Sequence, residues 1–96
     1  MTEILKIADF IKSLESEMDC KIPYEELKKI SKESFGKFEK SLFEHGLLLY
    51  LIVLKYRPTN ILEIGTGGGY SSLFMMKAIN DFKISSKIYS IDKNSI

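Results

Sequence analysis

The sequence predicts an α/β fold in which helices precede a strand, a glycine turn, a further helix and a second strand. Apolar residues recur at helical spacing through most of segment 1–40. The short apolar run 61–64 is followed at once by a glycine cluster, and a second such run, 87–92, ends in an acidic residue. We therefore expect a helical N-terminal segment, 1–40, and a helix–strand–turn–helix–strand unit, 41–96.

Composition narrows the class of protein. The chain has 96 residues, of which 45% are hydrophobic, as expected for one small globular domain. Its net charge of +1 gives no electrostatic reason to expect a nucleic-acid or membrane partner. The single Cys20 excludes an internal disulfide and fits a reducing cytoplasm. No secretory signal is recognisable, and the apolar run 47–54 is shorter than the roughly 18 residues of a membrane span.

Two helices are expected in the N-terminal segment. The first runs from an N-cap at Thr2 to about Met18, with an apolar stripe at Ile4, Ile7, Ala8, Ile11, Leu14 and Met18. The second starts at Pro23, a favoured first helical residue, and ends by Gly36, which suits the left-handed conformation after a helix. Lysines and glutamates alternate along this second helix, which indicates a solvated face.

A third helix is predicted from a capping box at Ser41–Glu44 to the residues before Pro58. Its central run, 47–54, is apolar on nearly every side, so it must be covered on more than one side. We expect this helix to pack against the sheet, with the N-terminal helices over it.

The glycine cluster marks the expected ligand-binding corner. A glycine turn between a strand and a helix lets a ligand approach the backbone closely, beside the free N–H groups of the helix. The dinucleotide fingerprint needs a glycine at its sixth position, which is Tyr70 counted from Gly65 and Ser72 counted from Gly67. A phosphate loop of the Walker type needs a lysine that this cluster lacks before Lys77. Both of these nucleotide motifs are therefore excluded.

Two acidic residues stand at the expected strand ends. Glu63 lies two positions before Gly65, and Asp92 ends the second strand, 87–92. A carboxylate at the tip of the second strand of such a unit can accept hydrogen bonds from both hydroxyls of a ribose. The two acids and the glycine turn together predict a nucleoside-containing ligand.

This pattern resembles the first motif of the class I S-adenosylmethionine-dependent methyltransferases. The run of His45-Gly46, an apolar helix, Tyr56-Arg57-Pro58, Ile61-Leu62-Glu63-Ile64-Gly65 and Gly69-Tyr70-Ser71 looks like the catechol and caffeoyl-CoA type O-methyltransferases. The resemblance covers about residues 41–96. It implies the first βαβ unit of a Rossmann-like methyltransferase fold, with an incomplete sheet because the later strands of the family have no counterpart here.

The resemblance also implies a cofactor and its ligands. S-adenosylmethionine would be contacted by Glu63, Gly65, Thr66, Gly67, Gly69, Tyr70, Ser71, Asp92 and Lys93. Among these, Ser71 would bind the cofactor's carboxylate, and Glu63 would hold its amino group directly or through water. Asp92 would hold the ribose, and Lys93 would lie near the adenine. No residue is assigned as general base or metal ligand.

Each of these positions has a structural alternative. In these alternatives the glycines form a turn without a ligand, Asp92 is a surface residue, and Ser71 and Ser72 are N-caps. Tyr70 fits the core as well as the pocket, and His45 is interpreted as structural. Two function classes follow: methyl transfer, expected on an oxygen of a small molecule, or a non-catalytic S-adenosylmethionine-binding or helical interaction fragment. A second copy or a partner chain would complete the sheet.

Overall fold

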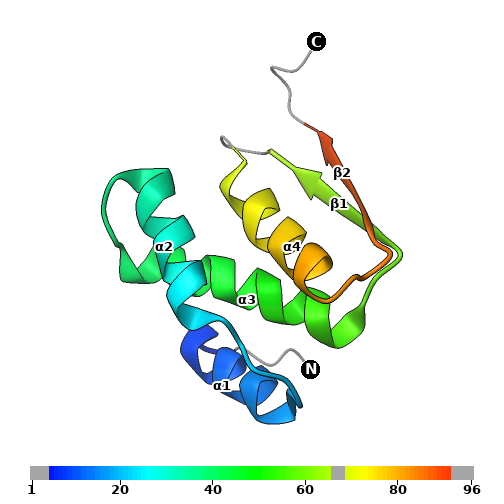
Figure 1. Ribbon diagram of the computed structural model, residues 1–96, viewed down its shortest axis with the longest axis horizontal. Helices are drawn as coiled ribbons and strands as arrows, with labels where there is room; N and C mark the ends of the chain where they lie inside the picture. Colours follow the sequence, from blue (N-terminus) through cyan, green and yellow to red (C-terminus); the bar gives the residue numbers. More distant parts are fainter. Residues whose placement is uncertain (1–4, 66–68, 92–96) are drawn as a thin grey trace.

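The computed structural model describes residues 5–65 and 69–91, which form four helices and two strands in an α/β arrangement (Figure 1). In chain order the elements are α1 (Ile7–Glu17), α2 (Tyr24–Phe35), α3 (Lys40–Tyr56), β1 (Asn60–Ile64), α4 (Tyr70–Asp81) and β2 (Lys87–Ile91). The predicted order of elements is therefore confirmed. In the described part of the chain, no helix is long and apolar enough to cross a membrane.

The two strands form a parallel pair connected through α4. Ile61 is paired with Ile88 and Ile64 with Ile91. Parallel strands need a crossover connection, and α4 provides it, as expected for a βαβ unit. The helices lie to one side of the strands in Figure 1, so in residues 5–65 and 69–91 one sheet face receives a helical cover.

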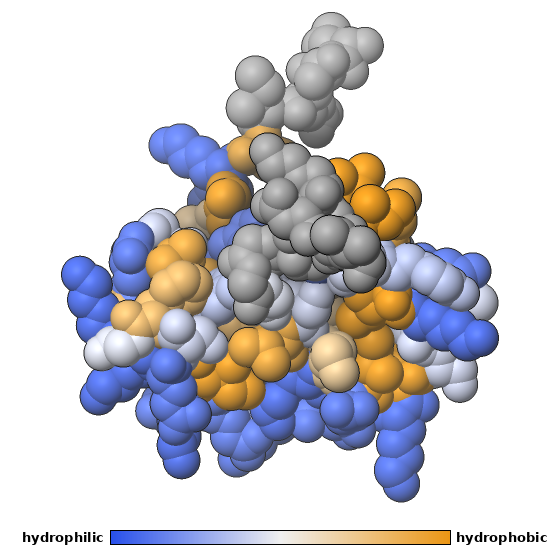
Figure 2. Space-filling model, turned by 90° about the horizontal axis from the view of Figure 1, so that it is seen from above, coloured by the Kyte–Doolittle hydropathy of each residue, from blue (hydrophilic) through white to orange (hydrophobic). Residues whose placement is uncertain are grey.

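The other face of the sheet is apolar and open. Leu62 and Ile64 of β1 are 63% and 77% exposed, and Tyr89 and Ile91 of β2 are 53% and 56% exposed. Successive strand residues point to opposite faces, so these four side chains share one face while Ile61 and Ile88, both half-buried, point toward the helices. Apolar residues also come to the surface at several places in the view of Figure 2.

Helix α3 is the centre of the core. Tyr50 and Leu51 are fully buried, and α3 contacts α4 most extensively, followed by α1 and α2. Gly46 makes the close approach of α4 possible, because a Cβ there would lie 2.7 Å from the buried ring of Phe74. The expected coverage of α3 on several sides is confirmed. Its main partners are other helices, however, and a pocket separates part of α3 from β1.

The N-terminal helices begin later than the sequence predicts. Helix α1 starts at Ile7 after the extended residue Lys6, so Leu5 and Lys6 are not helical and the expected N-cap at Thr2 lies outside the described residues. Pro23 is the N-cap of α2, one position before the helix it was expected to begin. Gly36 does adopt the predicted left-handed conformation at the end of α2, with φ of 75°.

The predicted capping box at the start of α3 is wrong. The helix begins at Lys40, its N-cap is Glu39, and no side chain caps it. Ser41 therefore lies inside the first turn, where its hydroxyl donates to Glu39 Oε1 at 2.9 Å. The backbone N–H of Phe43 donates to Glu39 O at 3.0 Å, so helical bonding already starts two residues before the predicted cap. The predicted end is confirmed, since Arg57 leaves the helix in the left-handed region just before Pro58.

The buried Tyr50 makes folding stability depend on alkaline pH. Its hydroxyl donates to Asp81 Oδ2 at 3.0 Å, and burial, followed by this hydrogen bond, raises the pKa of Tyr50 well above its ordinary value. The folded state thus holds this proton more tightly than the unfolded state. Stability is retained below about pH 10, where an ordinary tyrosine ionises, and falls as the pH rises above it.

For Tyr50→Phe we expect a free energy of unfolding about 1 kcal/mol lower at neutral pH, from the lost hydrogen bond. We also expect a shallower fall in stability between about pH 9 and 11, because one strongly shifted phenol is gone. Urea unfolding at several pH values measures both effects. Tyr56→Phe, at a 60% exposed position, is the matched control. An alkaline decline as steep in Tyr50→Phe as in the wild type would contradict this role.

Candidate functional site

The glycine corner joins the carboxyl ends of both strands. Gly65 follows β1 with φ of 76°, and its N–H donates to the carbonyl of Ile91, the last residue of β2, at 2.7 Å. Gly69 is the N-cap of α4, with φ of 85°. A Cβ at either glycine would meet no atom of the described residues within 4 Å, while the positive φ disfavours any side chain there. The corner therefore has accessible backbone of the kind a ligand can approach.

Four of the predicted cofactor residues lie outside the described part of the chain: Thr66, Gly67, Asp92 and Lys93. The described neighbours fix where these segments attach. Residues 66–68 connect Gly65 to Gly69, and residue 92 follows Ile91, which is hydrogen-bonded to Gly65. The two predicted ligand-binding segments therefore start from adjacent points of the backbone.

Glu63 links the three elements that meet at the corner. Its Oε1 accepts hydrogen bonds from Ser72 of α4 at 2.6 Å and from Ser90 of β2 at 3.2 Å. Its Oε2 is buried and has no hydrogen-bond partner among the described residues. A buried carboxylate oxygen without a partner is costly, so its presence indicates a missing donor. The sequence predicted Glu63 but gave no indication of its two serine partners.

A pocket of about 390 Å³ opens between α3, β1 and α4. Its lining is mostly apolar and consists of His45, Leu49, Ile52, Val53, Pro58, Asn60, Ile61, Leu62, Glu63, Ser71 and Met75. The only ionisable side chains among these lining residues are His45 and Glu63. An apolar pocket with a few polar groups is the usual form of a small-molecule site.

Ser71 and His45 meet at this pocket. Ser71 Oγ lies 3.4 Å from His45 Nε2, and both residues line the cavity. The alternative reading of Ser71 and Ser72 as N-caps is wrong, because Gly69 occupies the N-cap position and both serines lie in the first turn of α4. Their hydroxyls point instead to His45 and Glu63. The sequence could not indicate the pairing with His45, which depends on how closely α3 packs on α4.

Tyr70 belongs to a different part of the molecule. Its hydroxyl donates to the carbonyl of Leu42 at 2.8 Å and lies 3.0 Å from Ser31 Oγ. Its ring packs against Phe35 and Phe74, with centroids 4.6 Å and 5.0 Å away. Burial raises the pKa of its phenol. Of the two readings of Tyr70, these contacts favour the packing role, and the residue does not line the pocket beside Glu63.

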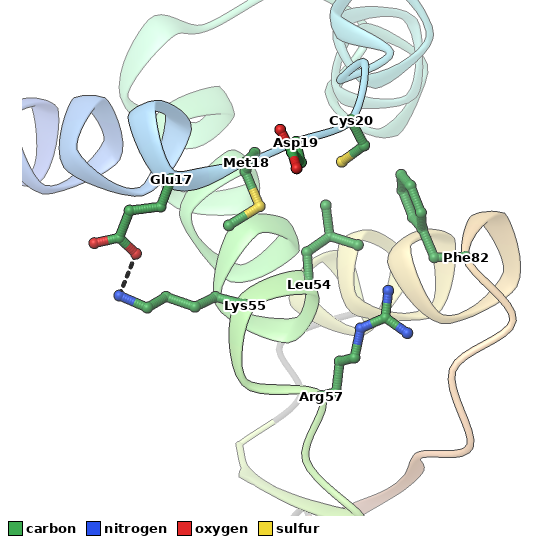
Figure 3. A pocket seen from close by; sticks show the side chains of 8 residues that line it. All are labelled: Glu17, Met18, Asp19, Cys20, Leu54, Lys55, Arg57 and Phe82. Atoms are coloured by element: carbon green, nitrogen blue, oxygen red, sulfur yellow. Dashed lines mark ion pairs between the residues drawn. The ribbon is translucent and has the colours of Figure 1, made fainter.

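A second pocket, of about 320 Å³, lies at the C-terminal end of α3 (Figure 3). It is lined by Glu17, Met18, Asp19, Cys20, Leu54, Lys55, Arg57 and Phe82. An ion pair between Lys55 and Glu17 crosses one side of it. None of the predicted cofactor residues lines this pocket, so it is separate from the glycine corner. In the described ranges, no group of three or more His, Cys, Asp or Glu side chains is placed to hold a metal ion.

Comparison with known proteins identifies no family for this chain. No family model, no curated protein and no solved structure matches the chain.

Proposed function

We propose that this chain is the cofactor-binding portion of an S-adenosylmethionine-dependent methyltransferase that acts on an oxygen of a small molecule. The observation that carries the proposal is the arrangement around Glu63. This acid is the second-last residue of β1, beside an open glycine turn, and it lines the pocket. Its Oε2 is buried and has no hydrogen-bond partner among the described residues. Both the sequence motif and this geometry support Glu63 as a ligand of the cofactor.

The side chains present have the chemical character needed to bind both the amino-acid end and the nucleoside of S-adenosylmethionine. The orphaned oxygen of Glu63 can accept a hydrogen bond from an ammonium group, and a charged donor of this kind makes the strongest hydrogen bonds. Ser71 offers a hydroxyl in the first turn of α4, where the helix dipole also favours a carboxylate. In this proposal Asp92 and Lys93 continue from the end of β2 to the ribose and adenine.

The contribution of these residues to methyl transfer is orientation. When bound, S-adenosylmethionine supplies an electrophilic methyl group on a sulfonium sulfur, which an acceptor oxygen attacks as the carbon–sulfur bond breaks. Glu63 and Ser71 fix one end of the ligand and Asp92 the other, so that the methyl group is presented in one direction. Positioning of this kind accounts for a large part of the rate enhancement in two-substrate reactions. The proposal assigns no residue of this chain to the acceptor.

A non-catalytic binding role is the second candidate, and the open sheet face favours it. Leu62, Ile64, Tyr89 and Ile91 present apolar side chains that a second polypeptide would bury. In that case the chain would bind S-adenosylmethionine, or a protein partner, without turnover. A measurement of S-adenosylmethionine binding distinguishes a cofactor-binding role from a purely structural one.

Thermal unfolding with a panel of nucleotides tests the cofactor assignment. We expect S-adenosylmethionine, present at 100 times its dissociation constant, to stabilise the folded chain by about 2.7 kcal/mol. This corresponds to a rise in Tm of roughly 11–22 °C for a domain of this size. NAD and ATP are expected to leave Tm unchanged, because the glycine spacing fits neither motif. Stabilisation by NAD or ATP and not by S-adenosylmethionine would contradict the assignment.

A further inference from the structure

The pocket between α3, β1 and α4 has a polar pair besides Glu63, and the sequence indicates no ligand role for the histidine of this pair. His45 and Ser71 meet there, with Nε2 and Oγ 3.4 Å apart. His45 is exposed, so its imidazole is available to a ligand and to protons from solvent. Its neighbour Gly46 is buried against Phe74, and this close contact between α3 and α4 holds His45 opposite Ser71.

The charges around this pocket are few and of opposite sign. Among the described residues of the lining, Glu63 from β1 and His45 from α3 are the ionisable groups, and none is a lysine or arginine. On its own helix His45 follows Glu44, and on the facing helix the residues from Ser71 to Met76 carry no charge. In the part of the lining that the structure describes, a protonated His45 is thus the one cation and Glu63 the one anion. This pair is complementary to a zwitterion.

We infer that His45, in its protonated form, binds the carboxylate of the cofactor's amino-acid end together with Ser71, while Glu63 binds the ammonium group. The inference rests on the proposed function and adds to it a binding residue and a dependence on pH. Both N–H groups of an imidazolium are donors, so one can reach Ser71 while the other faces the ligand. An imidazole carries a positive charge only when it is protonated, so cofactor binding is expected to be tighter at the more acidic pH.

Calorimetric titration at pH 6.0 and 7.5 tests the inference with three forms of the chain. The wild type is expected to bind S-adenosylmethionine roughly threefold to tenfold more tightly at pH 6.0 than His45→Gln does, and the difference shrinks at pH 7.5. Comparison at each pH cancels the titration of the ligand's own amine. His45→Lys keeps a cation at both pH values and is expected to bind tightly at both. A merely structural role for His45 would produce neither the pH-dependent difference nor the rescue by lysine.

A second ligand isolates the amino-acid end. 5′-Methylthioadenosine retains the nucleoside and lacks both the ammonium and the carboxylate. Its affinity is expected to be the same in the wild type and in His45→Gln at either pH. Because His45 is the only histidine of the chain, the C2 proton of its ring gives an unambiguous NMR signal. That signal is expected to move on addition of S-adenosylmethionine and to stay in place with methylthioadenosine.

The outcomes separate this inference from the proposed function. If S-adenosylmethionine binds equally well to the wild type and His45→Gln at pH 6.0, the role of His45 is overturned while the cofactor assignment stands. If the wild type binds no S-adenosylmethionine at either pH, the proposed function fails and the inference fails with it. The His45 position is exposed, so the two substitutions are expected to leave the fold intact, which circular dichroism checks.

Discussion

Replacement of Phe74 by alanine is expected to lower the free energy of unfolding by about 3–5 kcal/mol, a large part of the roughly 5–15 kcal/mol that holds a small domain together. The ring is fully buried, and it lies between α4 and the helix that forms the centre of the core. It packs on Tyr70 and is close enough to Gly46 to exclude a methyl group there. No neighbour can fill the space that the ring leaves without moving α3 and α4 together.

Leu73→Ala is the matched control for this prediction. Leu73 is the preceding residue of the same helix, but its side chain is 46% exposed. The substitution removes apolar atoms from the solvated side of α4, so its effect is expected to stay below about 1 kcal/mol. Urea unfolding of both variants gives the comparison. A cost for Phe74→Ala no larger than that for Leu73→Ala would contradict the account of the α3–α4 contact.

Local sequence patterns predicted much of the fold. The apolar runs at 61–64 and 87–92, with a glycine turn and a helical pattern between them, led to the parallel pair β1 and β2. Gly36 and Pro58 marked helix ends because their backbone preferences act at one position. The predicted first residues of the helices were less accurate than the predicted last residues. The capping box was wrong because the helix begins at Lys40 and its N-cap, Glu39, takes part through its backbone carbonyl alone, which a side-chain motif cannot indicate.

The candidate site was predicted in part. Glu63 and Gly65 could be found because a motif fixes them relative to the strand end. The partners of Glu63, Ser72 and Ser90, come from two other elements, and their approach depends on how α4 and β2 lie against β1. His45 lies 26 positions from Ser71, and only the close packing at Gly46 brings the two together. Tertiary contacts of this kind leave no periodic pattern in a single sequence, so the sequence could not predict them.

Asp92→Ala is expected to weaken S-adenosylmethionine binding about tenfold to hundredfold. This range corresponds to the 1–3 kcal/mol of a hydrogen bond made by a charged group. The reason is the position of the acid in the chain. Asp92 follows Ile91, the last residue of β2, whose carbonyl accepts a hydrogen bond from Gly65 in the glycine turn. A carboxylate there can accept both ribose hydroxyls, and alanine can accept neither.

Asp19→Ala is the matched control, since it removes one negative charge from an exposed loop residue that lines the other pocket. Its affinity for S-adenosylmethionine is expected to equal that of the wild type. If Asp19→Ala weakened binding as much as Asp92→Ala, the effect would be one of overall charge and not of a ribose contact.

Calorimetric titration of S-adenosylmethionine into the wild-type chain, beside Asp92→Ala, tests the central claim most directly. The account predicts saturable binding with one site per chain and a marked loss of affinity in the variant. Absence of binding heat with the wild type, together with an unchanged Tm in the presence of the ligand, would contradict it. The glycine turn and Glu63 would then serve to connect β1 to α4 and would hold no cofactor.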